Sequence, residues 1–429
     1  MRILIIENEV FPGGKKPGSA LLAELSARSF ARHERLARAF MARGDSVLFV
    51  SQDPSPKGSA PVLEFRSENG LSKLLLSRDE KKDFFSRAFA EAVLLSENAA
   101  GIAGLFRPNV VFSAGFLPLT VFPAKKIAKL SGAVLVSELP CSAPKLFRKL
   151  HAAKTPLTVL SVLEAARRTA IQKSTVLFAP YPASETEIPL SKAFFYLLPP
   201  FEKTVIPSEK AKLLRASLET LREGGTFVLA ASGTFQKGCS WEALLAAVGR
   251  FDRKFSLVFL TDGESKTVLS RKVREQGLSN VTFLDFVSEA EQSFVLSAAS
   301  AVFVSESTVL GRLVSESDRF LTVLSAGRPV LAVARENAAL FRQSEGAVLT
   351  LPNDIEGISR GIELLRNAAP EKLDLLGQKG KAFAESRDFE HLFPALCRRF
   401  DELIGQQKED FSYDPCYRHR KYDHGIRDF

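Results

Sequence analysis

The sequence predicts an α/β protein built from two doubly wound, parallel-sheet domains in tandem. Short apolar runs rich in Val, Leu, Ile and Phe alternate with longer helical patterns along most of the chain, as is typical of parallel sheets covered by helices. The alternation breaks once, between residues 199 and 225, where three prolines, a charged helical stretch and a Gly-Gly pair occur. A chain of 429 residues is also long for a single hydrophobic core. Together these observations indicate two domains.

The first predicted domain opens with an apolar strand at residues 3–6, followed by a Gly/Pro/Lys loop and a helical pattern that ends at Gly44. The next strand is expected at residues 47–50. Amphipathic periodicity predicts helices around residues 73–99 and 158–172. Further strands of this domain are expected at residues 110–113, 133–137 and 176–179.

The second predicted domain repeats the alternation of strand and helix. Its strands are expected at residues 227–231, 257–260, 281–284, 302–304, 330–333 and 348–351. Because ligands of such sheets bind at the carboxyl ends of the strands, we expect the site in a crevice between the domains. The chain divides into a first domain (1–200), a linker (201–225), a second domain (226–388), a helix that returns to the first domain (389–405) and a basic, aromatic tail (406–429).

Cysteine usage and the first residues indicate a reduced, cytoplasmic location. The four cysteines lie far apart without a C-x-x-C spacing, so neither a zinc knot nor a redox pair is expected. Glu7 interrupts the first apolar run before a secretory signal could form. The longest uncharged stretch, residues 108–124, is shorter than the roughly 20 apolar residues of a membrane-spanning helix.

The net charge of +9 indicates attraction to polyanions. The basic residues are dispersed, with local density at residues 145–154 and 167–168. They are interpreted either as an ordinary solvated surface or as a contact with anionic membrane at its inner face. The tail is interpreted either as flexible or as a membrane or partner contact. Nucleic-acid binding is not expected, because the sequence holds no basic strand with interleaved aromatic residues and no recognised module.

Several chemistries lack their usual motifs. There is no G-x-x-x-x-G-K-[ST], no G-x-G-x-x-G after the first strand and no H-E-x-x-H. A D-x-D pair, which would hold a divalent cation against a diphosphate, is also absent. We therefore expect a site without metal or cofactor, in which Lys, Arg and backbone N–H groups neutralise phosphate.

Two turns of the second domain supply candidates for phosphate binding. Gly233 and Thr234 leave its first strand, and Lys237 precedes the following helix. Gly233 lets the backbone approach a phosphate, and Lys237 supplies charge. Asp262 and Gly263 close a later strand and open another helix. Taken singly, each feature is also an ordinary turn.

The order of these motifs resembles the retaining glycosyltransferases of family 4 in the GT-B class. Near the N-terminus, residues 32–38 and 43–47 are similar to that family's "RHxxLAxxLxxRGHEV" helix. In the second domain, similar motifs are "G…KG" at 233–238, "GDG" at 261–263, "VxFLG" at 281–285, "AAD" at 298–300 and "YLAAGKPVLA" at 323–332. The resemblance implies a GT-B fold, with two Rossmann-like doubly wound domains facing a cleft.

The resemblance also implies an activity. A sugar would pass from a nucleoside-diphosphate-sugar to a glycan or lipid-linked acceptor with retention of configuration and without a metal. Lys237, Arg319 and helix N-termini would stabilise the leaving diphosphate. Arg319 holds the position of a basic residue common in this subgroup.

The acceptor side is assigned by the same resemblance to residues of the first domain. Glu138 stands where relatives often have an Asp that faces the cleft; it is otherwise a helix N-cap or a solvated carboxylate. Arg32 and His33 lie on the first helix, where His33 is otherwise a satisfied structural residue. Gly13 and Gly14 either close over the phosphates or merely turn the chain.

One family motif is altered. The family carries E-x7-E, with one Glu near the donor sugar and one on the ribose, but Val314 and Thr322 occupy these positions. Thr322 can bond one hydroxyl, and Glu306 or Glu316 could enter from a shifted loop. Two alternatives therefore stay open: a degenerate GT-B protein that acts as a binding or scaffolding partner, and an epimerase or hydrolase that uses the same donors.

Overall fold

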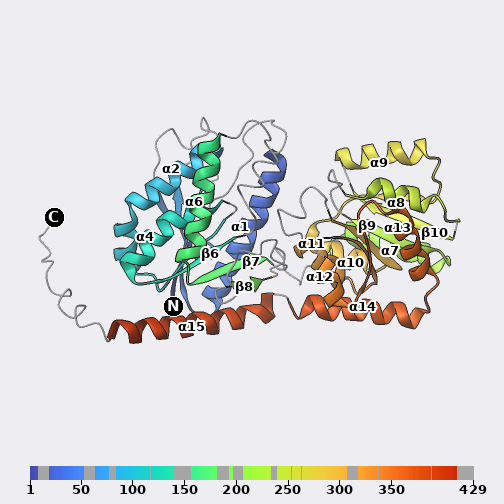
Figure 1. The fold of residues 1–429 in the computed structure, drawn as a ribbon. Coiled ribbons are helices and arrows are strands. Elements are labelled where there is room, and N and C mark those ends of the chain that lie inside the picture. Colours follow the sequence, from blue (N-terminus) through green and yellow to red (C-terminus); the bar gives the residue numbers. More distant parts are fainter. Residues whose placement is uncertain are drawn as a thin grey trace, which may run out of the picture. The chain divides into compact units, whose positions relative to one another are not determined.

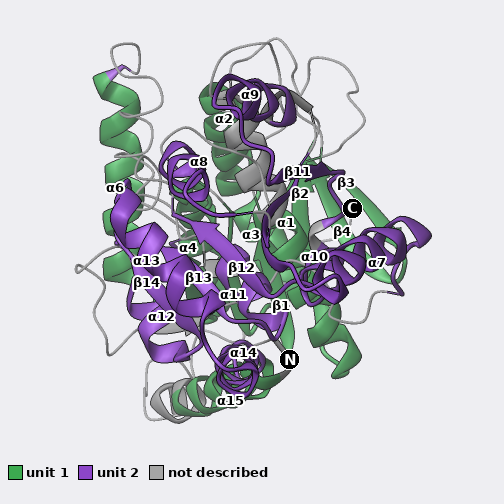
Figure 2. Ribbon diagram, turned by 90° about the vertical axis from the view of Figure 1, so that its right-hand side faces the viewer, with its two compact units in different colours: residues 1–138, 157–177, 390–429 green, residues 139–156, 178–389 purple. Residues whose placement is uncertain are grey.

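The computed structural model describes residues 1–7, 19–52, 63–76, 84–115, 117–139, 156–180, 193–196, 206–232, 239–252, 254–261, 263–306, 317–335, 338–387 and 389–412. The chain divides into two compact units, shown in Figure 2. The first unit comprises Met1–Glu138, Leu157–Leu177 and Glu390–Phe429, and the second comprises Leu139–Pro156 and Phe178–Phe389.

The first sheet has eight strands in the order β3-β4-β2-β1-β5-β6-β7-β8. Figure 1 labels its strands β6, β7 and β8. Strand β1 pairs in parallel with β2 and β5, and β5 pairs in parallel with β6. The strand order reverses between β1 and β5, which is where ligands bind in open sheets of this kind. The strands are β1 (Arg2–Ile6), β2 (Ser46–Gln52), β3 (Leu63–Glu68), β4 (Leu71–Leu76), β5 (Val110–Ser113), β6 (Val134–Glu138), β7 (Val176–Pro180) and β8 (Ala193–Tyr196).

Helices cover both faces of this sheet because its strands are apolar on both sides. Leu4, Val111 and Leu135 pack against α2, α3 and α4, whereas Phe49 on the other face meets Phe30 of α1 at 5.5 Å between ring centroids. The helices of the first unit are α1 (Ser19–Ala42), α2 (Phe84–Glu97), α3 (Ala99–Phe106), the short 3-10 helix η1 (Pro118–Thr120), α4 (Val121–Ser131), α6 (Leu157–Lys173) and α15 (Phe389–Ser412).

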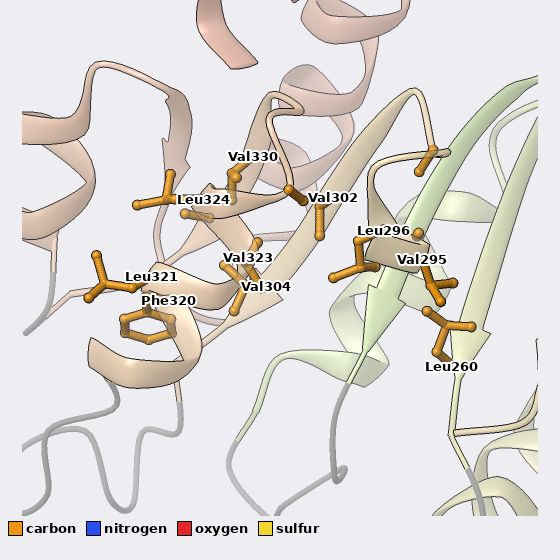
Figure 3. Packing of buried hydrophobic residues seen from close by; sticks show 14 of the residues in the cluster. Leu260, Val295, Leu296, Val302, Val304, Phe320, Leu321, Val323, Leu324 and Val330 are labelled. Carbon is orange, nitrogen blue, oxygen red and sulfur yellow. The ribbon is translucent and has the colours of Figure 1, made fainter. Parts of the chain in front are cut away.

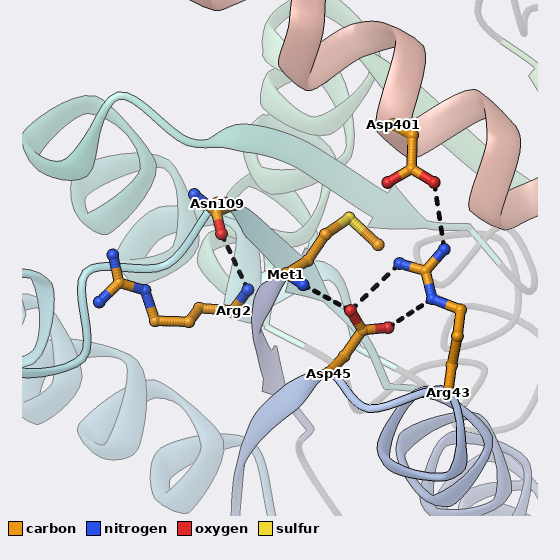
Figure 4. Close-up of polar contacts among 6 residues, drawn as sticks. All are labelled: Met1, Arg2, Arg43, Asp45, Asn109 and Asp401. Carbon is orange, nitrogen blue, oxygen red and sulfur yellow. Dashed lines mark hydrogen bonds and ion pairs between the residues drawn. The ribbon is translucent and has the colours of Figure 1, made fainter.

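Helix α15, from the end of the chain, packs on α1. The ring of Phe40 lies 5.0 Å from that of Phe393 and stacks on that of Phe400 at 6.0 Å. Figure 4 shows a polar contact nearby, in which Arg43, directly after α1, pairs with Asp401 of α15 at 3.2 Å. Arg43 also pairs with Asp45 at 2.7 Å, so it joins the turn before β2 to α15.

The second sheet has six strands in the order β11-β10-β9-β12-β13-β14. All five neighbouring pairs are parallel. The order reverses between β9 and β12, which defines the topological switch point of the second unit. The strands are β9 (Phe227–Ser232), β10 (Phe255–Leu260), β11 (Val281–Leu284), β12 (Ala301–Ser305), β13 (Val330–Val333) and β14 (Ala347–Thr350).

Two hydrophobic clusters sandwich this sheet, because alternate residues of each strand point to opposite faces. In β12, for example, Val302 and Val304 join the cluster of Figure 3, while Phe303 joins the cluster on the opposite face. The covering helices are α7 (Glu209–Glu223), α8 (Trp241–Val248), α9 (Gly263–Glu275), α10 (Glu289–Leu296), α11 (Ser317–Ser325), α12 (Ala338–Ser344), α13 (Ile355–Arg366) and α14 (Pro370–Glu385).

The structure confirms the predicted fold class of two doubly wound, parallel-sheet domains, and every strand expected from the sequence is present. One predicted element is wrong in part. The helix expected from residue 73 begins only at Phe84, and Leu71–Leu76 is instead strand β4. It pairs antiparallel with β3 across a turn at Asn69 and Gly70, whose φ angles are 51° and 80°. Two successive positive φ angles suit a two-residue hairpin turn.

The predicted domain boundaries stay a prediction, as does the crevice between the domains. Strand β8 belongs to the first sheet by its pairing, although the chain from Phe178 onward is assigned to the second compact unit. Helix α7 lies within the expected linker, and α15 continues past residue 405 to Ser412. Among the described helices, none alone is long and apolar enough to cross a membrane; α2 and α3 reach that length and composition only together, as a pair bent by 59°.

Candidate functional site

A buried cluster of charged side chains lies at the carboxyl edge of the first sheet. Glu7 directly follows β1, and Glu138 is the last residue of β6, two strands away in the sheet. Helix α1 supplies Arg32, His33 and Ser29, whose spacing of three to four residues places them on one face of the helix. The cluster therefore spans the switch point between β1 and β5.

The imidazole of His33 bridges the two carboxylates. Its Nε2 lies 2.7 Å from Glu138 Oε2, and its Nδ1 pairs with Glu7 Oε2. Arg32 Nη2 donates to the other oxygen of Glu138 at 2.7 Å. Ser29 Oγ lies 3.4 Å from Glu7 Oε1, and the His33 ring rests against Phe112 of β5, 5.8 Å between centroids. All four charged residues are buried.

Burial and pairing shift the pKa values of this cluster in different directions. Burial alone would lower the pKa of His33, but the Glu138 and Glu7 carboxylates outweigh it and raise the pKa to about 9. Burial would raise the pKa of Glu138, yet Arg32 and His33 hold it below its ordinary value. For Glu7, burial and the neighbouring Glu138 carboxylate outweigh the cations His33 and Arg32, and the pKa is raised. His33 is therefore an imidazolium at neutral pH.

The structure brings together the predicted acceptor-side residues Arg32, His33 and Glu138. The interpretation of Glu138 as a solvated carboxylate is wrong, because its side chain is fully buried. Sequence reasoning missed Glu7, although a signal was present, since a carboxylate directly follows the apolar run of β1. The interactions within the cluster hold the ends of two strands and one helix in fixed relation.

A second buried carboxyl group lies at the same edge. Glu91 of α2 accepts a hydrogen bond of 2.5 Å from Nε2 of Gln52, the last residue of β2. Burial raises the pKa of Glu91 to about 7, and the Gln52 amide and Arg87 only partly oppose it. This group consequently changes its protonation state near neutral pH.

In the second unit, polar groups converge where β12 and β13 end. Glu306, directly after β12, is buried, and its Oε2 accepts a hydrogen bond of 2.7 Å from the backbone N–H of Arg335. Arg319 of α11 donates through Nη2 to the carbonyl oxygen of Ser305. Both predicted donor-side residues thus lie at the carboxyl edge beside the switch point, in contact with the backbone there.

The N-terminus of α8 is fixed to the same strand end. The backbone N–H of Ser240 donates to Ser305 Oγ at 2.9 Å, and Ser240 Oγ accepts from the backbone N–H of Asn353 at 3.0 Å. Cys239 contacts the carbonyl oxygen of Ser305 through its sulfur at 3.7 Å. These bonds place the positive end of the α8 dipole at the edge that carries Arg319.

The other predicted site residues are less fully placed. Gly263 is the first residue of α9, and Thr322 lies half-buried in α11, where its carbonyl oxygen accepts from Ser325 Oγ. The proposed meeting of Lys237 with Arg319 stays a prediction. Gly13, Gly14, Gly233, Thr234, Lys237, Asp262, Val314 and Glu316 lie outside the described residues.

Within the described part of the chain, no three His, Cys, Asp or Glu side chains gather in a way that could hold a metal ion. The expectation of a metal-free site therefore continues to depend on the sequence motifs.

No protein-family model matches the sequence, and no curated protein matches it. Solved structures do match along nearly the whole chain. Sucrose-phosphate synthase from Thermosynechococcus elongatus superposes with a TM-score of 0.63 at 16% identity, covering 94% of this chain and 99% of that one. The α,α-trehalose 6-phosphate synthase of Burkholderia multivorans gives 0.58 at 10%, covering 95% and 100%.

HepE from Anabaena, solved in complex with UDP, gives a TM-score of 0.57 at 16% identity, covering 96% of this chain and all of that one. At such low identity the likeness establishes the fold. The architecture of two Rossmann-like, parallel-sheet domains that this chain shares with these proteins is the GT-B fold implied by its sequence motifs.

Proposed function

We propose that this protein is a glycosyltransferase that uses a nucleoside-diphosphate-sugar. The observation that carries the proposal is the convergence of Arg319, Glu306 and the N-terminus of α8 on one strand end of the second sheet, beside its switch point. A cation and a helix N-terminus are the groups that bind phosphate without a metal. The structures of HepE hold UDP or UDP-glucose, so uridine nucleotides are the first donors to test.

Catalysis would depend on charge stabilisation rather than on a dedicated base. As the bond between sugar and diphosphate breaks, negative charge develops on the leaving oxygen, and Lys237, Arg319 and backbone N–H groups would stabilise it. The acceptor oxygen would bond to the anomeric carbon on the same face that the diphosphate leaves, which retains the configuration, and the leaving phosphate would accept the proton of the acceptor hydroxyl. The absence of a D-x-D pair supports a reaction without a divalent cation.

The acceptor is proposed to be a glycan or a lipid-linked molecule, bound in the cytoplasm at the inner face of a membrane. In this scheme, the cluster of Glu7, Arg32, His33 and Glu138 fixes the acceptor-side edge of the first sheet. Because the cluster residues are buried and paired with one another, we assign them to holding the edge in shape.

A second candidate keeps the fold without turnover. Val314 and Thr322 replace the two carboxylates of the family motif, and the Glu306 carboxylate bonds to the backbone of Arg335. A protein that binds a nucleotide-sugar but does not transfer it would have this pattern. Measurements of binding and turnover distinguish the two candidates.

Thermal stabilisation by UDP-, GDP-, ADP- and TDP-sugars tests binding first, because a ligand bound only by the native state raises the melting temperature. We expect one nucleotide class to stabilise the protein with EDTA present. Lys237→Ala should weaken that binding by up to about 3 kcal/mol, the range of a charge-assisted hydrogen bond. Lys372→Ala, an exposed lysine of α14, is the matched control. If no nucleotide stabilises the wild type, the proposal is wrong.

Restoring the motif tests the second candidate. Thr322→Glu should tighten binding of nucleotides that contain ribose, and Val314→Glu should tighten binding of the intact nucleotide-sugar alone. Release of UDP that requires an added acceptor identifies transfer, whereas release without an acceptor identifies hydrolysis. Binding without release from the wild type would favour the non-catalytic candidate.

A further inference from the structure

Two helices of the first unit present an exposed side almost without charge. On α2 this side carries Phe89 and Val93, which are 44% and 40% exposed, and on α3 it carries Leu105, which is 91% exposed. The remaining exposed residues from Ser86 to Leu105 are small or polar, and Glu97 is the single charged side chain among them. A helix on a protein surface in water normally turns charged residues outward. Such an uncharged side indicates a partner with an apolar region.

Helix α4, which packs against α2 and α3, adds cations beside this surface. Lys125, Lys126 and Lys129 are exposed, and Lys126 Nζ donates to the carbonyl oxygen of Ser96 near the end of α2 at 2.8 Å. Leu130 of α4 is 54% exposed next to them. Arg107, directly after α3, is also exposed. From α2 through α4, four exposed cations therefore accompany one exposed carboxylate.

The three helices form one layer. Leu95 of α2, Ile102 of α3 and Ile127 of α4 belong to a single buried cluster against the first sheet. Their opposite sides therefore point away from that sheet together. This layer is here called the α2–α4 face, and it comprises Phe89, Val93, Leu105, Leu130, Lys125, Lys126, Lys129 and Arg107.

We propose that the α2–α4 face docks the protein onto an anionic lipid surface. Apolar side chains enter the boundary between headgroups and acyl chains, while lysines next to them bind phosphate groups. The charge pattern selects this partner over a second copy of the chain, because a symmetric contact would place the lysines of the two copies against each other. The proposal deepens the proposed function, since it locates the membrane contact of an enzyme with a lipid-linked acceptor.

Vesicle flotation with the full chain measures the docking without any need for turnover. Phosphatidylcholine vesicles are compared with vesicles that also contain about 30% phosphatidylserine, at about 0.15 M salt so that weak surface charge is screened. We expect binding to the anionic vesicles alone. Each lysine near an anionic surface contributes about a fivefold change in partition, so Lys125→Glu with Lys129→Glu should reduce binding by at least about tenfold.

Leu105→Asp tests the apolar part. Because Leu105 is highly exposed, we expect the variant to fold as the wild type does, and circular dichroism checks this. We expect it to reduce partition at least about fivefold. Leu213→Asp on α7, at a leucine 69% exposed, and Lys372→Glu on α14 are the matched controls and should bind as the wild type does.

Absence of wild-type binding to anionic vesicles would overturn the proposal, as would equal losses in the control variants. Dimerisation in analytical ultracentrifugation that Leu105→Asp abolishes, without vesicle binding, would assign the face to a second copy instead. Nucleotide-induced stabilisation of the same variants is measured in parallel. The nucleotide-induced stabilisation tests nucleotide binding and not membrane docking. A failure of the docking proposal is therefore distinguishable from a failure of the proposed function.

Discussion

Replacement of His33 by glutamine removes the central cation of the buried cluster while keeping a polar side chain. Glu138 would keep Arg32 at 2.7 Å, but Glu7 would keep the Ser29 hydroxyl at 3.4 Å in place of an ion pair. Breaking a buried pair from one side costs about 3–5 kcal/mol, because a charge is left without compensation. We expect His33→Gln to destabilise the first unit by about that amount near pH 6.

The pH dependence gives this prediction its sign. The folded-state pKa of His33 is raised from 6.5 to about 9, so its stabilisation is fully present below pH 6.5 and is lost as the pH rises through about 9. At about 1.4 kcal/mol per pKa unit, the contribution at stake is about 3 kcal/mol. The pKa of Glu138 is lowered in the folded state, so Glu138 affects stability at acidic pH. Its stabilisation of the folded state is lost as the pH falls below the ordinary value of 4.5. The difference between wild type and variant should therefore be largest near pH 6 and small at pH 10.

Hydrogen exchange measured by mass spectrometry reports on the strands that carry the buried cluster. Peptides from β1 and β6 of the wild type and of His33→Gln are compared at equal pH, near pH 6 and near pH 9.5. Trp241, the single tryptophan, lies buried in the second unit, so its fluorescence during urea unfolding serves as an internal control. The double variant with Glu7→Gln should recover part of the loss, because it also removes the uncompensated carboxylate.

Two results would refute the reasoning. One is a loss below about 1 kcal/mol near pH 6, which would be no more than an exposed ion pair contributes. The other is a loss of the same size at both pH values, which would show that the His33 side chain acts through its shape rather than its charge.

Three further variants test other contacts. Gly377→Ala should destabilise the second unit by about 1–3 kcal/mol in urea unfolding, because its Cβ would lie 2.2 Å from the carbonyl oxygen of Gly327, whereas Gly405→Ala meets open space and should not. Arg43→Ala should cost about 1 kcal/mol or less at low salt and less at high salt, since its ion pairs are partly exposed. Glu91→Gln should match the wild type near pH 4 but be more stable by up to about 3 kcal/mol at pH 8, because burial raises the pKa of Glu91 from 4.5 to about 7, and the stability of the protonated folded form is lost as the pH rises from 4.5 through 7.

Strand positions were predicted best from the sequence where burial on both faces alone determines the residue pattern. Strands β5, β11 and β13 begin and end at the predicted residues, since a continuous apolar run is what a strand buried on both faces requires. The hairpin of β3 and β4 was missed although Asn69-Gly70 is a strong turn signal. Charged residues such as Glu64 and Arg66 interrupt the apolar pattern of β3, which lies at the edge of the sheet and has no fully buried residue.

The candidate site was less predictable because its contacts are long-range. The resemblance pointed to Arg32, His33 and Glu138, and the structure shows them in contact. Glu7 is marked in the sequence as the carboxylate after the first apolar run, but its contact with His33 depends on how α1 packs against the strand ends, which no local pattern specifies. The bond between Glu306 and the backbone of Arg335 likewise depends on the pairing of β12 with β13.

The contact of α15 with α1 has a consequence for how the protein is made. Phe40 meets its partner Phe393 about 350 residues later in the chain. At roughly 5–20 residues per second, a ribosome needs about 20–70 seconds to make the intervening segment. Until then the apolar side of α1 around Phe40 lacks its cover, although the second unit can already fold. The part of the protein that is synthesised first is thus completed last, and a chaperone that shields apolar helices would act on it during that interval.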